Sequence, residues 1–210
     1  MEFEQFPVGG MGNISYLLIS DGEAALIDPA WEPELFEREI RNRNLKLKLI
    51  LLTHGHPDHV NSVTRLTEAF PETEVWLHEG DHFMASGCGR LLSPGDGESV
   101  SLGRTSITAL TTPGHSPGSV CWLTDGLIFT GDTLFNMNCG RVDLPGSSPE
   151  EMYNSLKKLS ALPPETAVLP GHSYNGPAGT LGLQLRSNEY LRMAAEGKKA
   201  LFLYGGSRQE

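Results

Sequence analysis

The sequence predicts an α/β fold in which strands and helices form stacked layers. Short apolar runs typical of buried strands alternate with segments whose apolar residues recur at helical spacing. Turns such as Asp21-Gly22 and Asp125-Gly126 join some of these runs as hairpins, which favours mixed sheets over an all-parallel barrel. No repeat of solenoid length, low-complexity tract or linker divides residues 1–210, so a single domain is the simplest interpretation.

The individual elements follow from apolar spacing and from the residues that begin and end each segment. Strand signals cover residues 3–8, 14–20, 24–28, 47–52, 74–78, 105–111, 119–124, 127–130 and 166–169. Helical spacing covers residues 32–43, 57–70, 149–162 and about 180–200, with a short helix at 79–86. Pro57 suits a first helical turn, and Pro71 ends that helix. Gly and Pro are frequent in residues 87–97, which predicts a loop.

Composition and charge argue against nucleic acids and membranes as partners of this protein. The chain has 16 Lys and Arg against 26 Asp and Glu, a formal net charge of -10, and no basic stripe of the kind that binds nucleic acid. No apolar run approaches the roughly 18 residues that span a membrane, and no basic segment opens the chain. Cys88, Cys121 and Cys139 are odd in number and lack CxxC spacing, so we expect reduced thiols. The sequence thus predicts a cytoplasmic protein without nucleic-acid or membrane partners.

The densest cluster of functional side chains is Thr53-His54-Gly55-His56-Pro57-Asp58-His59. It contains three imidazoles and a carboxylate, and it directly follows the predicted strand at residues 47–52. Loops at strand ends are held by a rigid scaffold that can aim several side chains at one point. Neutral imidazole and carboxylate are ligands that suit Zn, Fe and Mn. The cluster therefore predicts a metal site.

Three more polar residues follow strand signals and lie beside glycine, which lets the backbone turn sharply. They are His115 in Pro113-Gly114-His115, Asp132 in Thr130-Gly131-Asp132, and His172 in Pro170-Gly171-His172. Each of them alone is better explained by a structural role than by a functional one. Together with the cluster, however, they place five of the seven histidines at predicted strand ends.

This pattern resembles the metallo-β-lactamase superfamily, whose HxHxDH motif corresponds here to residues 54–59. The resemblance covers nearly the whole chain and implies a four-layer αββα sandwich of two mixed sheets flanked by helices. It assigns His54, His56 and His115 to one metal ion. Asp58, His59 and His172 go to a second ion, and Asp132 bridges both. The implied cofactors are two divalent ions, with zinc first and Fe or Mn as alternatives.

Two neighbouring cations explain why such a site needs no serine or cysteine nucleophile. About 3.5–4 Å apart, they can share a water, lower its pKa, present hydroxide at neutral pH and polarise a carbonyl. Asp58 has a second predicted role as the catalytic group that orients the hydroxide and handles its proton.

Two other features look chemical but favour structural roles. His78-Glu79-Gly80-Asp81-His82 matches HExxH, but His78 ends a strand signal and Gly80 interrupts the helix that this motif requires. Cys121 and Cys139 have no evident His or cation beside them in sequence, so we expect inert thiols.

Within the superfamily, the segment from Asp132 to Asp143 resembles the GDTLF…CGR segment of the glyoxalase II branch. That resemblance implies cleavage of a hydroxyacylglutathione-like thioester or similar ester, with a small glutathione or other thiol conjugate as substrate. The segment after His172 is short, so we expect a member of this branch that resembles its short chains, without the C-terminal helical domain of full-length glyoxalase II. Arg141, Tyr174 and Asn175 are the candidate substrate-binding residues, although a salt bridge to Asp143 explains Arg141 equally well.

Two alternatives stay open at this point, as does a homodimer. One is a mononuclear iron persulfide dioxygenase acting on glutathione persulfide, since those enzymes keep similar ligands. Leu144-Pro145-Gly146 after the CGR segment differs from the aromatic continuation usual there. The other is a metal-stabilised binding module without catalysis, because fold alone does not fix function.

Overall fold

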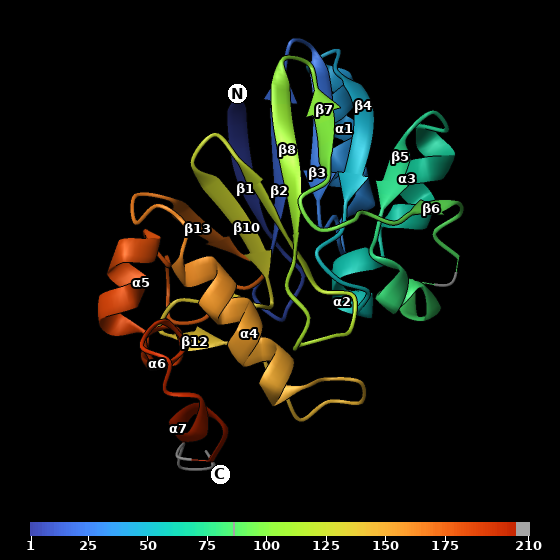
Figure 1. Ribbon diagram of the computed structural model, residues 1–210. Coiled ribbons are helices and arrows are strands. Elements are labelled where there is room, and N and C mark those ends of the chain that lie inside the picture. Colours follow the sequence, from blue (N-terminus) through green and yellow to red (C-terminus); the bar gives the residue numbers. More distant parts are fainter. Residues whose placement is uncertain (86, 205–210) are drawn as a thin grey trace.

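Two β-sheets pack face to face in the computed structural model, which describes residues 1–85 and 87–204 (Figure 1). The first sheet has the order β1-β2-β3-β4-β5-β6 and the second has the order β13-β10-β9-β8-β7. The first comprises β1 (Glu2–Val8), β2 (Asn13–Ser20), β3 (Glu23–Ile27), β4 (Lys46–Leu51), β5 (Glu74–Trp76) and β6 (Leu91–Leu92). The second comprises β7 (Ser99–Leu102), β8 (Thr105–Thr111), β9 (Val120–Thr124), β10 (Leu127–Gly131) and β13 (Ala167–Pro170). A separate hairpin pairs β11 (Leu134–Phe135) with β12 (Asn138–Cys139).

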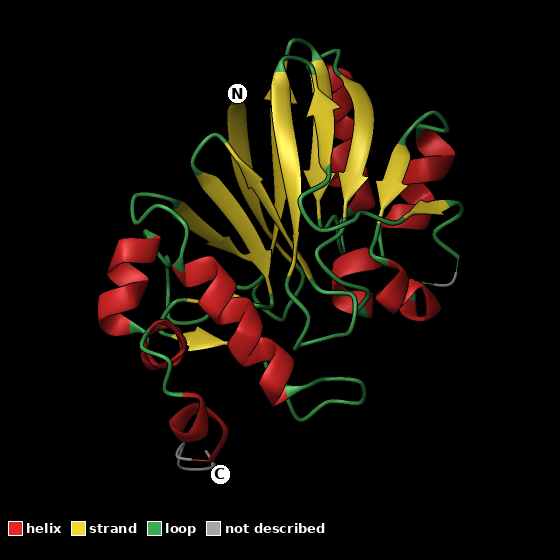
Figure 2. Cartoon of the chain, in the orientation of Figure 1, coloured by secondary structure: helices red, strands yellow, loops and turns green. Residues whose placement is uncertain are grey.

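Helices cover the outer face of each sheet (Figure 2). The first sheet is covered by α1 (Pro33–Asn42), α2 (Pro57–Val60) and α3 (Val63–Ala69). The second is covered by α4 (Pro149–Ser160), with α5 (Leu181–Ser187), α6 (Glu189–Ala195) and α7 (Lys199–Tyr204) packed beside it. A 3₁₀ helix, η1, spans Glu79–Met84.

Three apolar layers result from this arrangement. Tyr16, Trp122 and Phe129 are fully buried between the two sheets. Phe36 packs beneath the helices of the first sheet, and Leu156 packs beneath α4 of the second. Helices thus bury apolar side chains against the outer face of each sheet, and the inner faces of the two sheets pack on each other, which confirms the predicted four-layer αββα sandwich.

The strand directions bring distant loops to one edge of the sandwich. β3 and β4 run parallel, as do β10 and β13, so the carboxyl ends of each pair lie together. Two backbone contacts join the sheets at this edge: Val120 N–H donates to Thr53 O at 2.7 Å, and Asn13 bridges to His172. The loops that leave these four strands therefore converge.

Several local expectations were wrong. The single helix expected at 57–70 divides at Asn61 and Ser62, residue types that favour helix ends. Asn61 Oδ1 accepts a hydrogen bond from the backbone of Trp31, which fixes the chain at this break. Strand β6 lies inside the expected loop, and β7, β11 and β12 were not expected at all. The short helix expected at 79–86 is the 3₁₀ turn η1; Ser86 lies outside the described residues.

No helix in residues 1–85 and 87–204 is both long and apolar enough to cross a membrane.

Candidate metal centre

The HxHxDH segment leaves β4 and enters α2 at the edge where the strand ends converge. The buried carboxylate of Asp81 holds this segment against the loop that carries His115. It accepts hydrogen bonds from Gly55 N–H at 2.9 Å, from Gly118 N–H at 2.7 Å and from the Ser116 hydroxyl at 2.6 Å. The two loops are therefore held together by one side chain beneath them.

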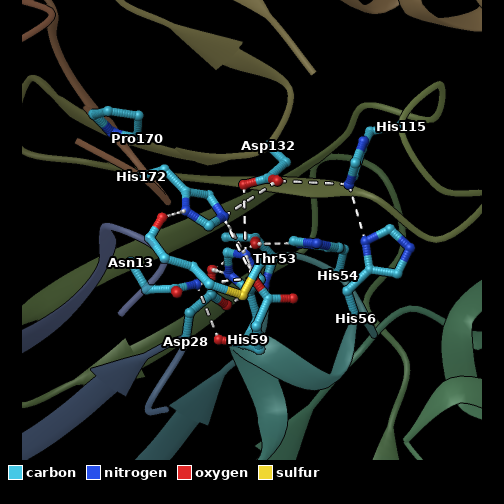
Figure 3. Close-up of polar contacts among 12 residues, drawn as sticks. Asn13, Asp28, Thr53, His54, His56, His59, His115, Asp132, Pro170 and His172 are labelled. Carbon is cyan, nitrogen blue, oxygen red and sulfur yellow. Dashed lines mark hydrogen bonds and ion pairs between the residues drawn. The ribbon is translucent and has the colours of Figure 1, made fainter. Parts of the chain in front are cut away.

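His54, His56 and His115 form a first group whose nitrogen atoms converge (Figure 3). His115 Nδ1 lies 3.0 Å from the carbonyl oxygen of Arg141, which can only accept, so Nδ1 carries the proton. In the neutral ring this leaves His115 Nε2 as the ligand atom, 2.9 Å from His56 Nδ1. His54 Nδ1 lies 3.1 Å from the hydroxyl of Thr53, and His54 Nε2 is buried without a hydrogen-bond partner.

Asp58, His59 and His172 form a second group. His59 Nε2 and His172 Nε2 lie 3.2 Å apart, and Asp58 Oδ2 lies 3.6 Å and 3.5 Å from them. The other ring nitrogen of each histidine is held from behind. His59 Nδ1 lies 3.1 Å from Asp28 Oδ2, and His172 Nδ1 lies 3.1 Å from the carbonyl oxygen of Met11. Such contacts orient the two rings and, in the neutral form of each, leave Nε2 as the ligand atom.

Asp132 lies between the two groups (Figure 3). Its Oδ2 is 3.5 Å from both His115 Nε2 and His172 Nε2, and its Oδ1 is 3.5 Å from His59 Nε2. Asp132 Oδ1 is buried with no hydrogen-bond partner. Gly131, which precedes Asp132, packs against Thr53 and has a φ of 47°. A Cβ at this position would lie 2.2 Å from Thr53 Oγ1, so glycine is needed for the backbone before Asp132 to lie this close to Thr53.

The donor set fits divalent cations. Orphaned buried acceptors are costly, and here His54 Nε2 and Asp132 Oδ1 both point into the space that the other nitrogen and oxygen atoms face. Imidazole nitrogen and carboxylate oxygen match zinc and other first-row metals. The arrangement can hold cations, polarise a bound carbonyl and bind water.

Burial and neighbouring charges set the protonation of the ligands. Burial, and after it the nearby histidines, hold the pKa of His54 well below its usual value, so the ring is neutral. Burial also opposes charge on Asp58, but the contacts with His172 and His59 outweigh it and lower the pKa. For His59, burial is outweighed by Asp132, Asp28 and Asp58, which raise the pKa to about 9. A cation bound at His59 must therefore displace a proton.

The candidate substrate residues differ in their relation to the site. The Tyr174 ring stacks on His172 with ring centres 4.7 Å apart and an interplanar angle of 6°, and the residue is 45% exposed. Asn175 donates from Nδ2 to the carbonyl of Asn136, so its side chain secures the β11–β12 hairpin.

Arg141 is exposed and forms a bidentate ion pair with Asp143 at 2.9 Å and 3.0 Å. This ion pair is the structural explanation of Arg141 that the sequence had left open beside a role in substrate binding. The backbone carbonyl of Arg141, in contrast, contacts the metal centre through His115 Nδ1.

In the described part of the chain, the HExxH-like segment does not form a metal-binding group of its own. His78 Nδ1 accepts from the backbone of Gly80, and His82 Nε2 lies 2.8 Å from the carbonyl of Leu77. Both rings are occupied with local backbone groups, as the interrupted helical pattern predicts.

Three buried residues of the site were missed by sequence reasoning: Asn13, Asp28 and Asp81. The sequence could have indicated Asp28, because this residue lies at the end of the predicted strand 24–28, just as the candidate ligands lie at the ends of other predicted strands. Asp81 lies in the HExxH-like segment, for which the sequence favoured only a structural role, and nothing in the sequence distinguishes Asn13.

Comparison with known proteins places this geometry in context. The family model of the metallo-beta-lactamase superfamily matches residues 8–172. The probable polyketide biosynthesis zinc-dependent hydrolase PksB of Bacillus subtilis is 37% identical over 81% of this chain and 77% of its own length. A hydroxyacylglutathione hydrolase of Francisella philomiragia is 34% identical over 77% of this chain, which spans only 63% of that relative. The crystal structure of TTHA1623 in a di-iron-bound form is 35% identical, with a TM-score of 0.79 over 89% of this chain and 99% of that chain.

Proposed function

The chain belongs to the metallo-β-lactamase superfamily, and we propose that it uses two divalent cations to hydrolyse a thioester or a similar ester. The observation that carries the proposal is the position of Asp132. Its Oδ2 lies 3.5 Å from His115 of the first ligand group and 3.5 Å from His172 of the second, and its Oδ1 lies 3.5 Å from His59 of the second group. A carboxylate shared in this way supports a pair of ions over a single one.

Similar proteins support the choice of metal and reaction. PksB is named as a zinc-dependent hydrolase, and TTHA1623 is described as holding two irons. We propose zinc at both positions, with iron or manganese as substitutes, because imidazole and carboxylate accept all three. When bound, the ions would supply Lewis-acid polarisation of the carbonyl and a lower pKa for water.

The residues of the chain supply orientation and proton handling. Asp58 stays ionised at neutral pH and keeps an acceptor oxygen beside His59 and His172, so it can receive the proton of attacking water. Burial, and after it Asp132 and Asp58, raise the pKa of Tyr174, so its hydroxyl remains a hydrogen-bond donor. Tyr174 is exposed over His172, where it can contact a substrate.

The substrate proposed is a small acyl thioester of glutathione or of another thiol. The relative named hydroxyacylglutathione hydrolase supports this class. Arg141 can exchange Asp143 for a substrate carboxylate, since both groups are exposed. Three free cysteines in the described residues support a reducing, cytoplasmic location.

Two assays on protein purified without added metal test the proposal. We expect about two metal ions per chain and turnover of S-lactoylglutathione or a related thioester. One iron per chain with oxygen uptake on glutathione persulfide would contradict the proposal and favour the dioxygenase. Metal without either activity on a panel of thioesters and esters would favour the binding module.

A further inference from the structure

Beneath the second group of ligands, a short chain of hydrogen bonds connects Asp58 to the exposed Trp31. Asn13 Nδ2 donates to Asp58 Oδ2 at 3.0 Å and to the Asp58 carbonyl at 3.0 Å. Trp31 Nε1 donates to Asn13 Oδ1 at 3.1 Å. Asn13 is 1% exposed, so its amide has few other partners.

The indole fixes which end of the Asn13 amide faces Asp58. An indole N–H can only donate, so it selects the amide oxygen and turns the NH₂ group toward the carboxylate. The same carboxylate oxygen that accepts from Asn13 lies 3.5 Å from His172 Nε2 and 3.6 Å from His59 Nε2. One lone pair of this oxygen is thus used by Asn13, while the other faces the ligand group.

Trp31 is held firmly although it is 43% exposed. Its φ of 66° is a left-handed conformation that a bulky residue rarely adopts without compensating contacts. The backbone N–H of Trp31 donates a hydrogen bond to Asn61 Oδ1 at 2.6 Å. The ring lies over Gly9, where a Cβ would approach Trp31 Cδ1 to 2.5 Å, so only glycine leaves room for the indole.

Asn13 also links the two parts of the second group that are far apart in sequence. Its backbone bridges to His172, while its side chain bonds to Asp58. Asn13 therefore holds the Asp58 carboxylate at a fixed position relative to the strand end that carries His172.

We infer that Trp31 and Asn13 are positioning residues, which orient the Asp58 carboxylate toward a cation in the second ligand group. The inference rests on the proposed dinuclear site. Neither residue touches the cation; Trp31 acts through Asn13, and Asn13 acts through Asp58. The expected consequence is specific: loss of either hydrogen bond weakens the second cation and leaves the first unaffected.

The test is zinc titration of metal-free protein in competition with a chromophoric chelator, which yields a dissociation constant for each ion. Trp31→Phe keeps an aromatic side chain at this position and removes the N–H donor together with part of the indole. Trp76→Phe is the matched control, because it removes an indole N–H whose hydrogen-bond partner is Glu74 and not a residue of the ligand groups. Thermal unfolding of each metal-free variant reports whether the fold is intact.

We expect Asn13→Ala to weaken the second zinc about 10–100-fold, the usual loss when an outer partner of a ligand is removed. Trp31→Phe should weaken it toward the lower end of that range, and Trp76→Phe should not change it. Because Trp31 acts through Asn13, the double variant should bind zinc as Asn13→Ala does.

Unchanged second-zinc affinity in Trp31→Phe and Asn13→Ala overturns the inference. Equal loss at both zinc sites, with a lower melting temperature of the metal-free variants, also overturns it in favour of a structural role. If the wild-type protein binds only one zinc, the dinuclear proposal itself fails, and that result is visible before any variant is made.

Discussion

Asp28 shows how much of the site depends on single buried residues. Its carboxylate accepts hydrogen bonds from the Thr53 backbone at 2.7 Å and the Thr53 hydroxyl at 2.6 Å, and it lies 3.1 Å from His59 Nδ1. It thus supports ligands of both groups, since Thr53 in turn contacts His54.

We predict that Asp28→Asn weakens zinc binding at His59 about 10–100-fold. The amide offers fewer acceptor sites than the carboxylate, so one of three buried donors loses its partner, which costs about 1–3 kcal/mol of stability. Asn tolerates the φ of 47° at this position, so backbone strain does not confuse the result. Asp125→Asn, the same change in an exposed left-handed turn, is the control; equal zinc affinity and stability in both variants would contradict this role.

The convergence of the candidate ligands was predictable, while the residues that support them were not. The seven candidate ligands share residue type and a position after a strand, and the structure brings all seven together. Asn13 and Asp81 act through tertiary contacts 45 and 26 residues away in the chain, to Asp58 and Gly55. No local pattern encodes such a contact.

The thiols provide a pH-dependent prediction. Burial raises the pKa of Cys121 to about 11, so the native side chain is a neutral thiol at pH 8. We expect iodoacetamide to modify Cys121 slowly in native protein at pH 8 and rapidly in urea, as measured by peptide mass spectrometry. The unfolded thiol ionises at lower pH than the folded one, so this group's contribution to stability is complete below about 9 and declines as pH rises toward 11. Equal modification rates with and without urea would contradict the burial.

At the scale of elements, long segments with clear apolar spacing were predicted well and short ones were not. The helix expected at 149–162 is α4, whose Ser148 cap accepts from the backbone of Glu151. Strands of two residues, such as β11 and β12, are too short to show alternation. Their hairpin is defined instead by contacts with the 173–179 loop, such as the hydrogen bond from Asn175 to Asn136.

Packing of α4 leads to a direct test of the outer layer. Leu156 is fully buried against the second sheet, and Leu156→Ala should lower the free energy of unfolding by about 2–5 kcal/mol through lost burial and a residual cavity. Lys157→Ala, the neighbouring change on the exposed face, should alter it by less than about 0.5 kcal/mol. Chemical denaturation measures both; similar values for the two variants would contradict the assigned packing.

At the scale of the whole molecule, the metal centre joins the two sheets. The HxHxDH segment follows β4 of the first sheet, whereas His115, Asp132 and His172 follow β8, β10 and β13 of the second. The alternation of strand and helix patterns predicts the α/β class, whereas the order of the four layers was implied by the family resemblance. The pairing between the sheets depends on their packing, which those patterns do not specify.

Removal of metal should therefore destabilise the entire sandwich. Zinc at 100 times its dissociation constant stabilises the folded state by about 2.7 kcal/mol, which corresponds to roughly 5–10 °C in melting temperature for a domain of this size. We expect chelation to lower the melting temperature by that amount and added zinc to restore it. A melting temperature that does not respond to chelator would show that the ligands are not bridged by metal.

The most direct test of the dinuclear site compares the zinc content of wild-type protein and Asp58→Ala after saturation with zinc and removal of free metal. Two zinc ions per chain in the wild type and one in Asp58→Ala are predicted, with thioester turnover reduced about 10²-fold if Asp58 also handles the proton. One zinc in the wild type, or two in the variant, would contradict the assignment of Asp58 to a second ion shared through Asp132.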